Sequence, residues 1–298
     1  MDWLFLSLVA TALWATSNMI DKVVLSEYIK RPLLYTALAG FLGFTFAMIE
    51  ISSLRVQIVA ALPLALCLLE GFIYIGALFF YFKSLSIEEV TRIVPVLQTI
   101  PLITLVLATI FLNEILKPYQ YIGVVFIIGG ALMVSLRKKN TGFFRINKAF
   151  WLISLSCILY GISWVLSKYI LSMVSYWNLF FWSRIGGFLA ICCMLFISPV
   201  ARKLVSLLKE IPRRSFSLLT TSEGVNLIAL FIVNIALSKG QASLVSTVTS
   251  SQPLFIILFV LFLSRHFPKL FAKELEKSSI TLKLIASIII IIGFFLVR

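Results

Sequence analysis

The amino-acid sequence predicts an all-α integral membrane protein of ten transmembrane helices, arranged as two inverted five-helix repeats. Three observations support this prediction. The 298-residue chain is 61% hydrophobic and only 13% charged, whereas soluble domains are about a quarter charged. Apolar runs of roughly 18 residues or more, each long enough to cross a bilayer as a helix, recur from end to end. Two stretches far apart in the chain also resemble each other.

The apolar runs define the helices in order, and their ends are marked by prolines, glycines and charged residues. The first run lacks a basic region and an A-x-A cleavage site, so we expect a retained helix rather than a signal peptide. The predicted linker 137–148 separates a first repeat, 1–136, from a second, 149–298. The predicted helices span residues 3–20, 32–51, 63–83, 90–112, 118–136, 150–171, 178–198, 216–238, 242–264 and 282–297.

The duplication rests on two alignments. At an offset of 152, Pro101 falls on Pro253, and at an offset of 146 the segment 13–25 aligns with 159–171. Because each repeat has an odd number of helices, the second begins on the opposite face of the bilayer and the two lie antiparallel. Inverted repeats are a common plan of secondary transporters, with the substrate near the midplane where the repeats meet.

Charge and cysteine content narrow the alternatives. The net charge of +14 lies mostly in short loops, where basic residues orient membrane proteins, and no nucleic-acid motif accompanies it. The basic loops follow helices 1, 3, 5, 7 and 9, so the charge count places those loops in the cytoplasm and both termini outside. The four cysteines lie in apolar runs without CxxC spacing, which favours buried packing over disulfides or metal ligands: Cys67, Cys157, Cys192 and Cys193.

A motif in each half connects the chain to a known family. A small-residue-rich helix with a proline is followed by a turn and then by a helix with spaced small residues. The motif residues are Pro101, Asn113, Glu114, Gly123 and Gly130 in the first half and Pro253, Ala286 and Gly293 in the second. On these residues the whole chain resembles the EamA-type branch of the drug/metabolite transporter superfamily.

The resemblance implies ten helices from a duplicated five-helix unit and the transport of small metabolites. It also implies cytoplasmic termini, against the charge count, so the side on which both termini lie stays open. The chain departs from the family pattern in two places. His266 stands where the second repeat would place the partner of Glu114. The second predicted helix lacks the arginine often found there, whereas the seventh carries Arg184.

Two carboxylates inside predicted helices are the strongest candidates for function. Glu70 and Glu223 are each followed by glycine and occupy nearly equivalent places in the two repeats. A charge in the hydrocarbon core costs about 2.5–3.5 kcal/mol on insertion scales. A carboxylate in such a site can take up a proton near neutral pH, which suits proton coupling or the binding of an amino group. The alternative is that both lie near the interface and face water. Helical spacing places Tyr74 beside Glu70, and Asn226 and Asn234 beside Glu223.

The first helix of each repeat carries aromatic, hydroxyl and amide side chains on one face. Such a face can hold an amphipathic metabolite by stacking and hydrogen bonding, although packing of helices through small residues would use the same residues. The predicted pocket residues are Trp14, Ser17 and Asn18 in the first half and Tyr160, Ser163 and Trp164 in the second.

Prolines and hydroxyl residues in predicted helices 4 and 9 suggest a mechanical role. Proline frees a backbone carbonyl, which nearby Ser and Thr can bind, so we expect a hinge or a broken helix in each. The residues are Pro95, Gln98, Pro101, Thr249, Gln252 and Pro253. Arg184 could bind a carboxylate or phosphate, or reach the interface. Glu114 is expected to be structural.

These features favour a secondary-active carrier that works by alternating access, exports amino-acid-like or amphipathic compounds and is coupled to protons. Uptake of a metabolite or cation, or a non-transporting scaffold or receptor, are the alternatives. An enzyme is not expected, because the sequence has no HExxH, no P-loop and a single histidine, His266. We expect no cofactor and no metal. The expected partners are the lipid bilayer of the plasma membrane, a small substrate and protons, with the chain a monomer or homodimer.

Overall fold

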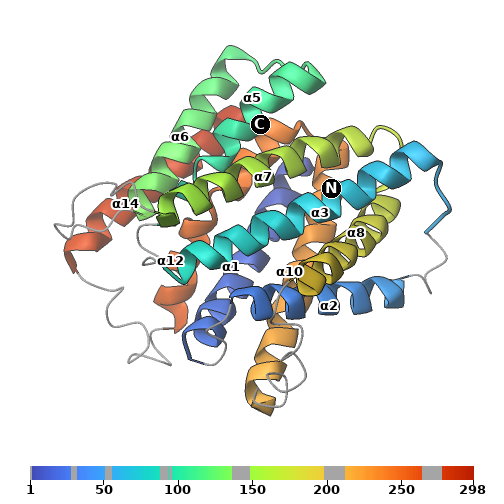
Figure 1. Ribbon diagram of the computed structural model, residues 1–298. Coiled ribbons are helices and arrows are strands. Elements are labelled where there is room, and N and C mark those ends of the chain that lie inside the picture. The colour runs from blue at the N-terminus through green and yellow to red at the C-terminus, as the bar shows by residue number, and fades with distance from the viewer. Residues whose placement is uncertain are drawn as a thin grey trace.

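The computed structural model describes residues 2–27, 32–50, 56–87, 93, 96–135, 148–197, 212–263 and 277–298. Within these residues all regular structure is helical (Figure 1). The helices are α1 (Trp3–Glu27), α2 (Pro32–Glu50), α3 (Ala61–Leu85), α5 (Ile100–Leu112), α6 (Pro118–Ser135), α7 (Lys148–Ile170), α8 (Tyr176–Ile197), α10 (Arg213–Lys239), α11 (Ala242–Thr249), α12 (Gln252–Leu263) and α14 (Lys277–Val297).

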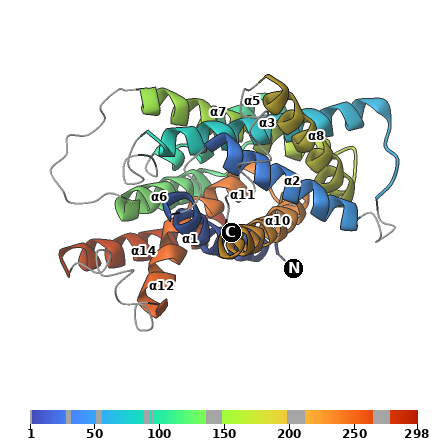
Figure 2. The same ribbon diagram turned by 60° about the horizontal axis from the view of Figure 1, so that its bottom comes forward.

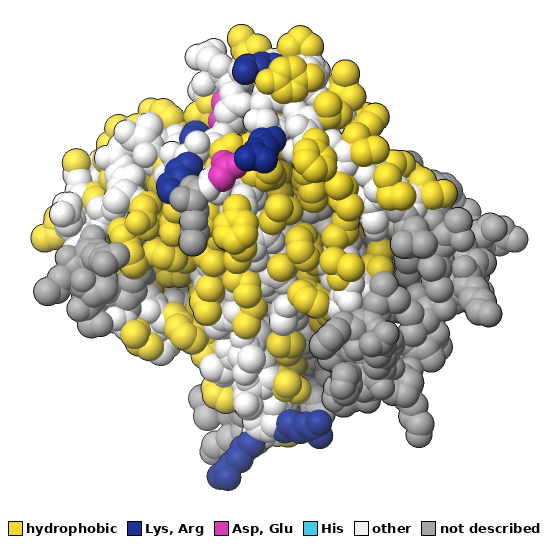
Figure 3. Space-filling view, turned by 180° about the vertical axis from the view of Figure 1, so that it is seen from behind, with side chains coloured by type: hydrophobic (Ala, Val, Ile, Leu, Met, Phe, Trp, Pro, Cys, Tyr) yellow, Lys and Arg dark blue, Asp and Glu magenta, His cyan; other side chains and the backbone are white. Residues whose placement is uncertain are grey.

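The helices have the length and surface of membrane spans. Among the described residues, seven candidate spans are long and apolar enough to cross a bilayer, six of them single helices and the seventh running from α11 into α12. Three shorter apolar helices accompany them. Large apolar side chains point outward: Phe196 on α8 is 93% exposed and Phe295 on α14 is 75% exposed. Figure 3 shows a broad band of hydrophobic side chains with Lys and Arg above and below it. The chain is therefore a multi-pass integral membrane protein, and the ten-helix, two-repeat arrangement stays a prediction.

The helix ends follow local rules. Pro32 and Pro118 begin α2 and α6, where the missing proline N–H costs nothing. Asn113 ends α5 in the left-handed conformation, with a φ of 53°, the only non-glycine residue with positive φ in the described part of the chain. The turn at Asn113 directs the chain into α6.

Pairs of helices from the two halves pack along their length. α1 packs on α10, α3 on α7 and α8, α2 on α8, and α6 on α14 (Figures 1 and 2). Glycines allow the closest approaches. A Cβ atom on Gly71 of α3 would overlap the Ser183 carbonyl oxygen of α8, and one on Gly123 of α6 would lie 3.0 Å from the Gly293 carbonyl oxygen of α14. Small residues bring helix backbones together in this way in membrane proteins.

Two predicted helices are interrupted. The predicted helix 242–264 is split, because α11 ends at Thr249 and α12 begins at Gln252. In the first half a turn at Gln98 and Thr99 precedes α5, so the predicted helix 90–112 is not continuous either. The proline that follows each turn has no N–H for the helical ladder, which explains the interruption. Of the predicted linker 137–148, all but Lys148 lies outside the described residues, and Lys148 begins α7.

Candidate functional site

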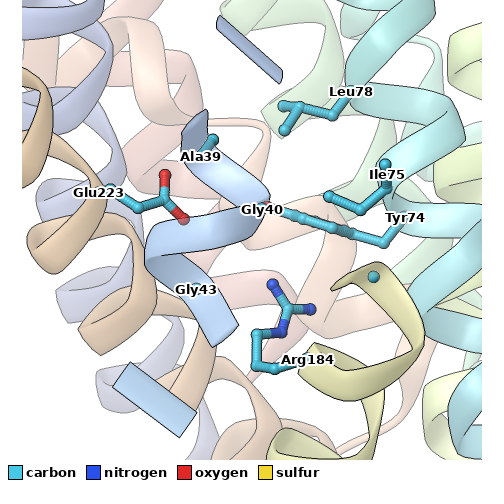
Figure 4. A pocket seen from close by; sticks show the side chains of 9 residues that line it. Ala39, Gly40, Gly43, Tyr74, Ile75, Leu78, Arg184 and Glu223 are labelled. Carbon is cyan, nitrogen blue, oxygen red and sulfur yellow. The ribbon is translucent and has the colours of Figure 1, made fainter. Parts of the chain in front are cut away.

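A pocket lies between α2 and α3 of the first half and α8 and α10 of the second (Figure 4). Its walls are mostly small or apolar. Its charged groups are one cation, Arg184, and one anion, Glu223. Binding sites for small molecules are typically apolar with a few polar groups that orient the ligand.

The guanidinium group of Arg184 packs against two aromatic rings. Its guanidinium carbon lies 4.8 Å from the centre of the Tyr74 ring and 5.8 Å from that of Phe180. The side chain is 8% exposed, and its Nε atom has no hydrogen-bond partner in the described part of the chain. Figure 4 shows the guanidinium group directed into the pocket. A buried guanidinium with a free donor can bind a planar anion such as a carboxylate.

Glu223 faces the same pocket from α10. A methyl group on Gly43 would lie 3.7 Å from Arg184 Cδ and 4.0 Å from Glu223 Oε1, so this glycine on α2 keeps open the space between the two charges. Asn226, one turn further on α10, donates from Nδ2 to both carboxylate oxygens of Glu223 at 3.3 Å. The indole N–H of Trp14 donates to Asn226 Oδ1 at 2.9 Å. Because that N–H can only donate, it fixes the orientation of the amide.

Glu70 has a different environment. It is 5% exposed and does not line the pocket. Ser163 on α7 donates to Glu70 Oε1 at 2.6 Å. Both residues were predicted to take part in substrate binding or coupling, and neither lines the pocket.

Predicted aromatic residues meet in pairs. Trp14 and Trp164 make an edge-to-face contact at 6.2 Å, and Tyr74 and Tyr160 make another at 5.9 Å. In each pair, one ring comes from the first half of the chain and the other from the second. Of these four, only Tyr74 lines the pocket.

A second polar cluster lies beside the pocket. The hydroxyl groups of Tyr35 on α2 and Ser222 on α10 both donate to Asp21 Oδ1 on α1. The predicted residue Ser17 joins the cluster, with its Oγ 2.9 Å from Ser222 Oγ. Sequence reasoning did not select Tyr35 or Ser222, because a single hydroxyl residue in a helix carries no distinct signal. The sequence feature that could have indicated this cluster is Asp21, a carboxylate on the same face of the first helix as Ser17.

Two predicted residues stand apart. Asn18 is exposed and Asn234 is buried on α10, and neither lines the pocket. The predicted hinge residue Pro95 lies outside the described residues.

The two helix interruptions have the same local structure. In the first half, Thr99 donates from both N–H (3.0 Å) and hydroxyl (2.7 Å) to the carbonyl of Val96. In the second half, Ser251 does the same to Val248, at 3.1 and 2.6 Å. Thr99 is 152 positions from Ser251, and Val96 is 152 positions from Val248. The broken helices expected from the prolines are present at both places, while movement about them stays a prediction.

The other predicted hinge residues lie at these interruptions. Gln98 is buried, and Gln252 Nε2 is buried without a hydrogen-bond partner among the described residues. Thr249 donates to the Ser246 carbonyl at 2.8 Å. Pro101 and Pro253 are buried in the first turns of α5 and α12.

Charged residues also hold the junction between α10 and α11. Glu114 receives hydrogen bonds from the N–H groups of Ala242 (2.8 Å) and Ser243 (3.1 Å) and from the Ser243 hydroxyl (2.7 Å). Lys168 donates to the carbonyl oxygens of Leu237 and Gly240 at 2.7 and 2.6 Å. The anion thus caps the start of α11 and the cation the end of α10, each at the helix end that favours its charge.

Comparison with known proteins finds a family match in the first half of the chain. Residues 1–136 match the EamA-like transporter family. The EamA-like match is in accord with the motif described above and with an EamA-type transporter of the drug/metabolite superfamily. The match suggests a membrane transporter, in a chain whose apolar helices place it in the bilayer.

The fold of this EamA-like chain also occurs among solved structures. One of them, described as "Crystal structure of protein", superposes with a TM-score of 0.73 at 16% sequence identity, covering 99% of this chain and 95% of that chain. At this identity the similarity shows the fold alone. No curated protein matches the sequence.

Proposed function

We propose that the chain is a secondary-active transporter of small metabolites that works by alternating access. One observation carries the proposal: a pocket between helices of both halves presents one buried cation, Arg184, and one anion, Glu223, across a small glycine-lined space. A rigid scaffold has no evident need for two such groups in a bilayer, because each is costly to bury there.

The transport mechanism we propose uses two inverted five-helix repeats. The helix contacts support them. If each helix is replaced by its counterpart in the other half, the α1–α10 contact becomes the α7–α3 contact, and the α2–α8 and α6–α14 contacts stay the same. The matching hydrogen bonds at Thr99 and Ser251 support the same relation. In this scheme the halves rock about α5 and the broken α11–α12 helix, whose interruptions supply the hinges.

The substrate we propose is an amino-acid-like or amphipathic compound. Arg184 would bind its anionic group and Glu223 its amino group, with the Tyr74 ring between them. Trp14 and Asn226 would orient Glu223. We propose export across the plasma membrane as the direction, and proton coupling through the intramembrane carboxylates Glu70 and Glu223. Uptake of a metabolite or cation is the second candidate, since the same pair of charges would serve it.

Counterflow in proteoliposomes tests the proposal. Vesicles holding the purified protein are loaded with unlabelled amino acids, nucleosides, sugars or polyamines, and exchange of the matching labelled compound is measured. Saturable exchange of one class, lost in Glu223→Gln and kept in the exposed control Asp2→Asn, is the expected result. No exchange of any class by well-folded protein would overturn it.

A further inference from the structure

We propose that Asp21 is a proton-binding residue of this transporter, separate from the carboxylate that lines the pocket. The inference rests on the proposed transport function for its role, but its site stands on geometry. Asp21 is the last residue of the candidate span Trp3–Asp21 and lies where α1 meets α2 and α10.

Three side chains form hydrogen bonds with the Asp21 carboxyl group: Tyr35, Ser222 and Ser17. Tyr35 and Ser222 both donate to Oδ1, so we place the proton on Oδ2, which neither of them contacts. Ser17 in turn positions Ser222. The Ser222 Oγ atom lies 3.1 Å from the carbonyl oxygen of Ser17 and contacts the Ser17 hydroxyl. The orientation of Asp21 is thus set by hydrogen-bond donors on α2 and α10.

The groups that the structure describes around Asp21 also favour a proton there. The charged and titratable groups that face it are Tyr35 on α2, Tyr81 on α3 and Glu223 on α10. A proton on Asp21 would remove the repulsion between its carboxylate and that of Glu223.

Asp21 is also connected to the pocket. Ser222, its hydrogen-bond donor, directly precedes Glu223, and the two carboxylates interact electrostatically. Neutralising one of two nearby negative charges makes it easier for the other to stay charged. An amino group bound at Glu223 would therefore change the proton affinity of Asp21, which is what coupling requires.

An apolar cluster borders Asp21. It consists of Val24 on α1, Leu34, Tyr35 and Leu38 on α2, Phe82 on α3 and Leu219 on α10. Because Tyr35 both belongs to this cluster and donates to Asp21, a movement of the cluster would change the surroundings of the proposed proton site.

The step is a proton transfer to and from water. In one conformation an O–H bond of a hydronium ion breaks as an O–H bond forms at Asp21 Oδ2, which leaves a neutral carboxyl group and water. In the other conformation the O–H bond at Oδ2 breaks as water takes up the proton to form hydronium. The driving force is the proton gradient itself.

Infrared difference spectroscopy tests the site with the proton as its probe. The purified protein in detergent is titrated with acid in the absence of any substrate, and the band of protonated carboxyl groups is followed. We expect one component of this band to disappear in Asp21→Asn and to shift in Tyr35→Phe and in Ser222→Ala, which each remove one donor. The control Asp2→Asn should match the wild type. Identical spectra of the wild type and a folded Asp21→Asn variant would overturn the proposal. If Asp21→Asn does not fold, the absence of a band shift in both Tyr35→Phe and Ser222→Ala would overturn it.

Flux measurements test the coupling. In proteoliposomes with a radiolabelled amino-acid mixture, Asp21→Asn should lose accumulation driven by a pH gradient and keep counterflow at equal pH. Gradient-driven accumulation as in the wild type would overturn the coupling role. Absence of counterflow in the wild type would instead contradict the proposed function, while the infrared result would stand on its own.

Discussion

Glu70 on α3 and Glu223 on α10 are the same two-residue pattern in two repeats, a carboxylate followed by glycine, yet their surroundings differ. Glu70 is sealed between helices and bonded to Ser163. Glu223 faces the pocket, whereas the guanidinium of Arg184 interacts electrostatically with both carboxylates. The difference shows that duplication keeps a residue type in place while the packing of its neighbours assigns it a new environment.

The glycines that follow them explain part of the difference. A Cβ atom on Gly71 would overlap backbone atoms of α8, so α3 and α8 are in direct contact beside Glu70. On Gly224 the nearest atom to such a Cβ is Phe46 Cζ at 3.5 Å, an ordinary contact. The tight crossing closes the space around Glu70, whereas the looser one leaves room beside Glu223.

The largest expected effect separates the two carboxylates. Glu223→Gln should abolish both counterflow and gradient-driven transport, because it removes the anion from the pocket. Glu70→Gln should abolish only the gradient-driven component, because Glu70 does not line the pocket. Both rates are measured in proteoliposomes with matched protein amounts. Equal effects of the two substitutions on counterflow would contradict the distinction.

The next effect concerns the cation opposite Glu223. Arg184→Lys keeps the charge but loses the planar pair of donors, so KM for an anionic substrate should rise about tenfold, equivalent to about 1.4 kcal/mol. Turnover at saturating substrate should change much less. Initial rates over a range of substrate concentrations separate the two, and an unchanged KM would remove Arg184 from the substrate site.

The glycines give a matched pair for stability. Gly71→Ala should destabilise the protein by about 1–3 kcal/mol, because the added methyl group forces α3 from α8. Gly224→Ala should be neutral or stabilise by up to about 1 kcal/mol, since alanine is the better helix former and its methyl group fits. Thermal unfolding in detergent compares them, with a lower Tm for Gly71→Ala only. A loss of similar size in both would show that the two crossings are alike.

The smallest effect lies in the hydrogen bond to Glu70. Ser163→Ala removes one donor and should cost about 1 kcal/mol of stability. Counterflow should be unchanged, because the pocket is not touched. Reduced counterflow in a variant with wild-type Tm would place Ser163 in contact with substrate.

The sequence predicted an all-helical membrane chain and the two helix interruptions, and three of its candidate site residues line the pocket: Tyr74, Arg184 and Glu223. Hydrophobic length specifies a span, and a proline without an N–H specifies where the ladder fails, so Pro101 and Pro253 located both breaks. Helical periodicity placed Tyr74 on the face of Glu70 and Asn226 on that of Glu223.

Periodicity did not predict partners across helices. It could not tell that Glu70 would meet Ser163 while Glu223 would meet a pocket, because that depends on which helices cross closely. The contributions of Gly40, Gly43 and Tyr35 also depend on how α2 lies against α8 and α10. Asn18 illustrates the limit: it shares the predicted face of helix 1 but is exposed.

The cap that Glu114 provides to α11 has a consequence for how the protein is made. The N–H groups of Ala242 and Ser243 find their acceptor on a residue synthesised about 130 positions earlier, in the other half. A second half produced alone would start α11 with these donors unpaired, at a cost of about 1–3 kcal/mol each where water is absent. Two separately expressed halves should therefore be degraded individually and rescued by co-expression, so that this one carboxylate makes the halves depend on each other during biogenesis.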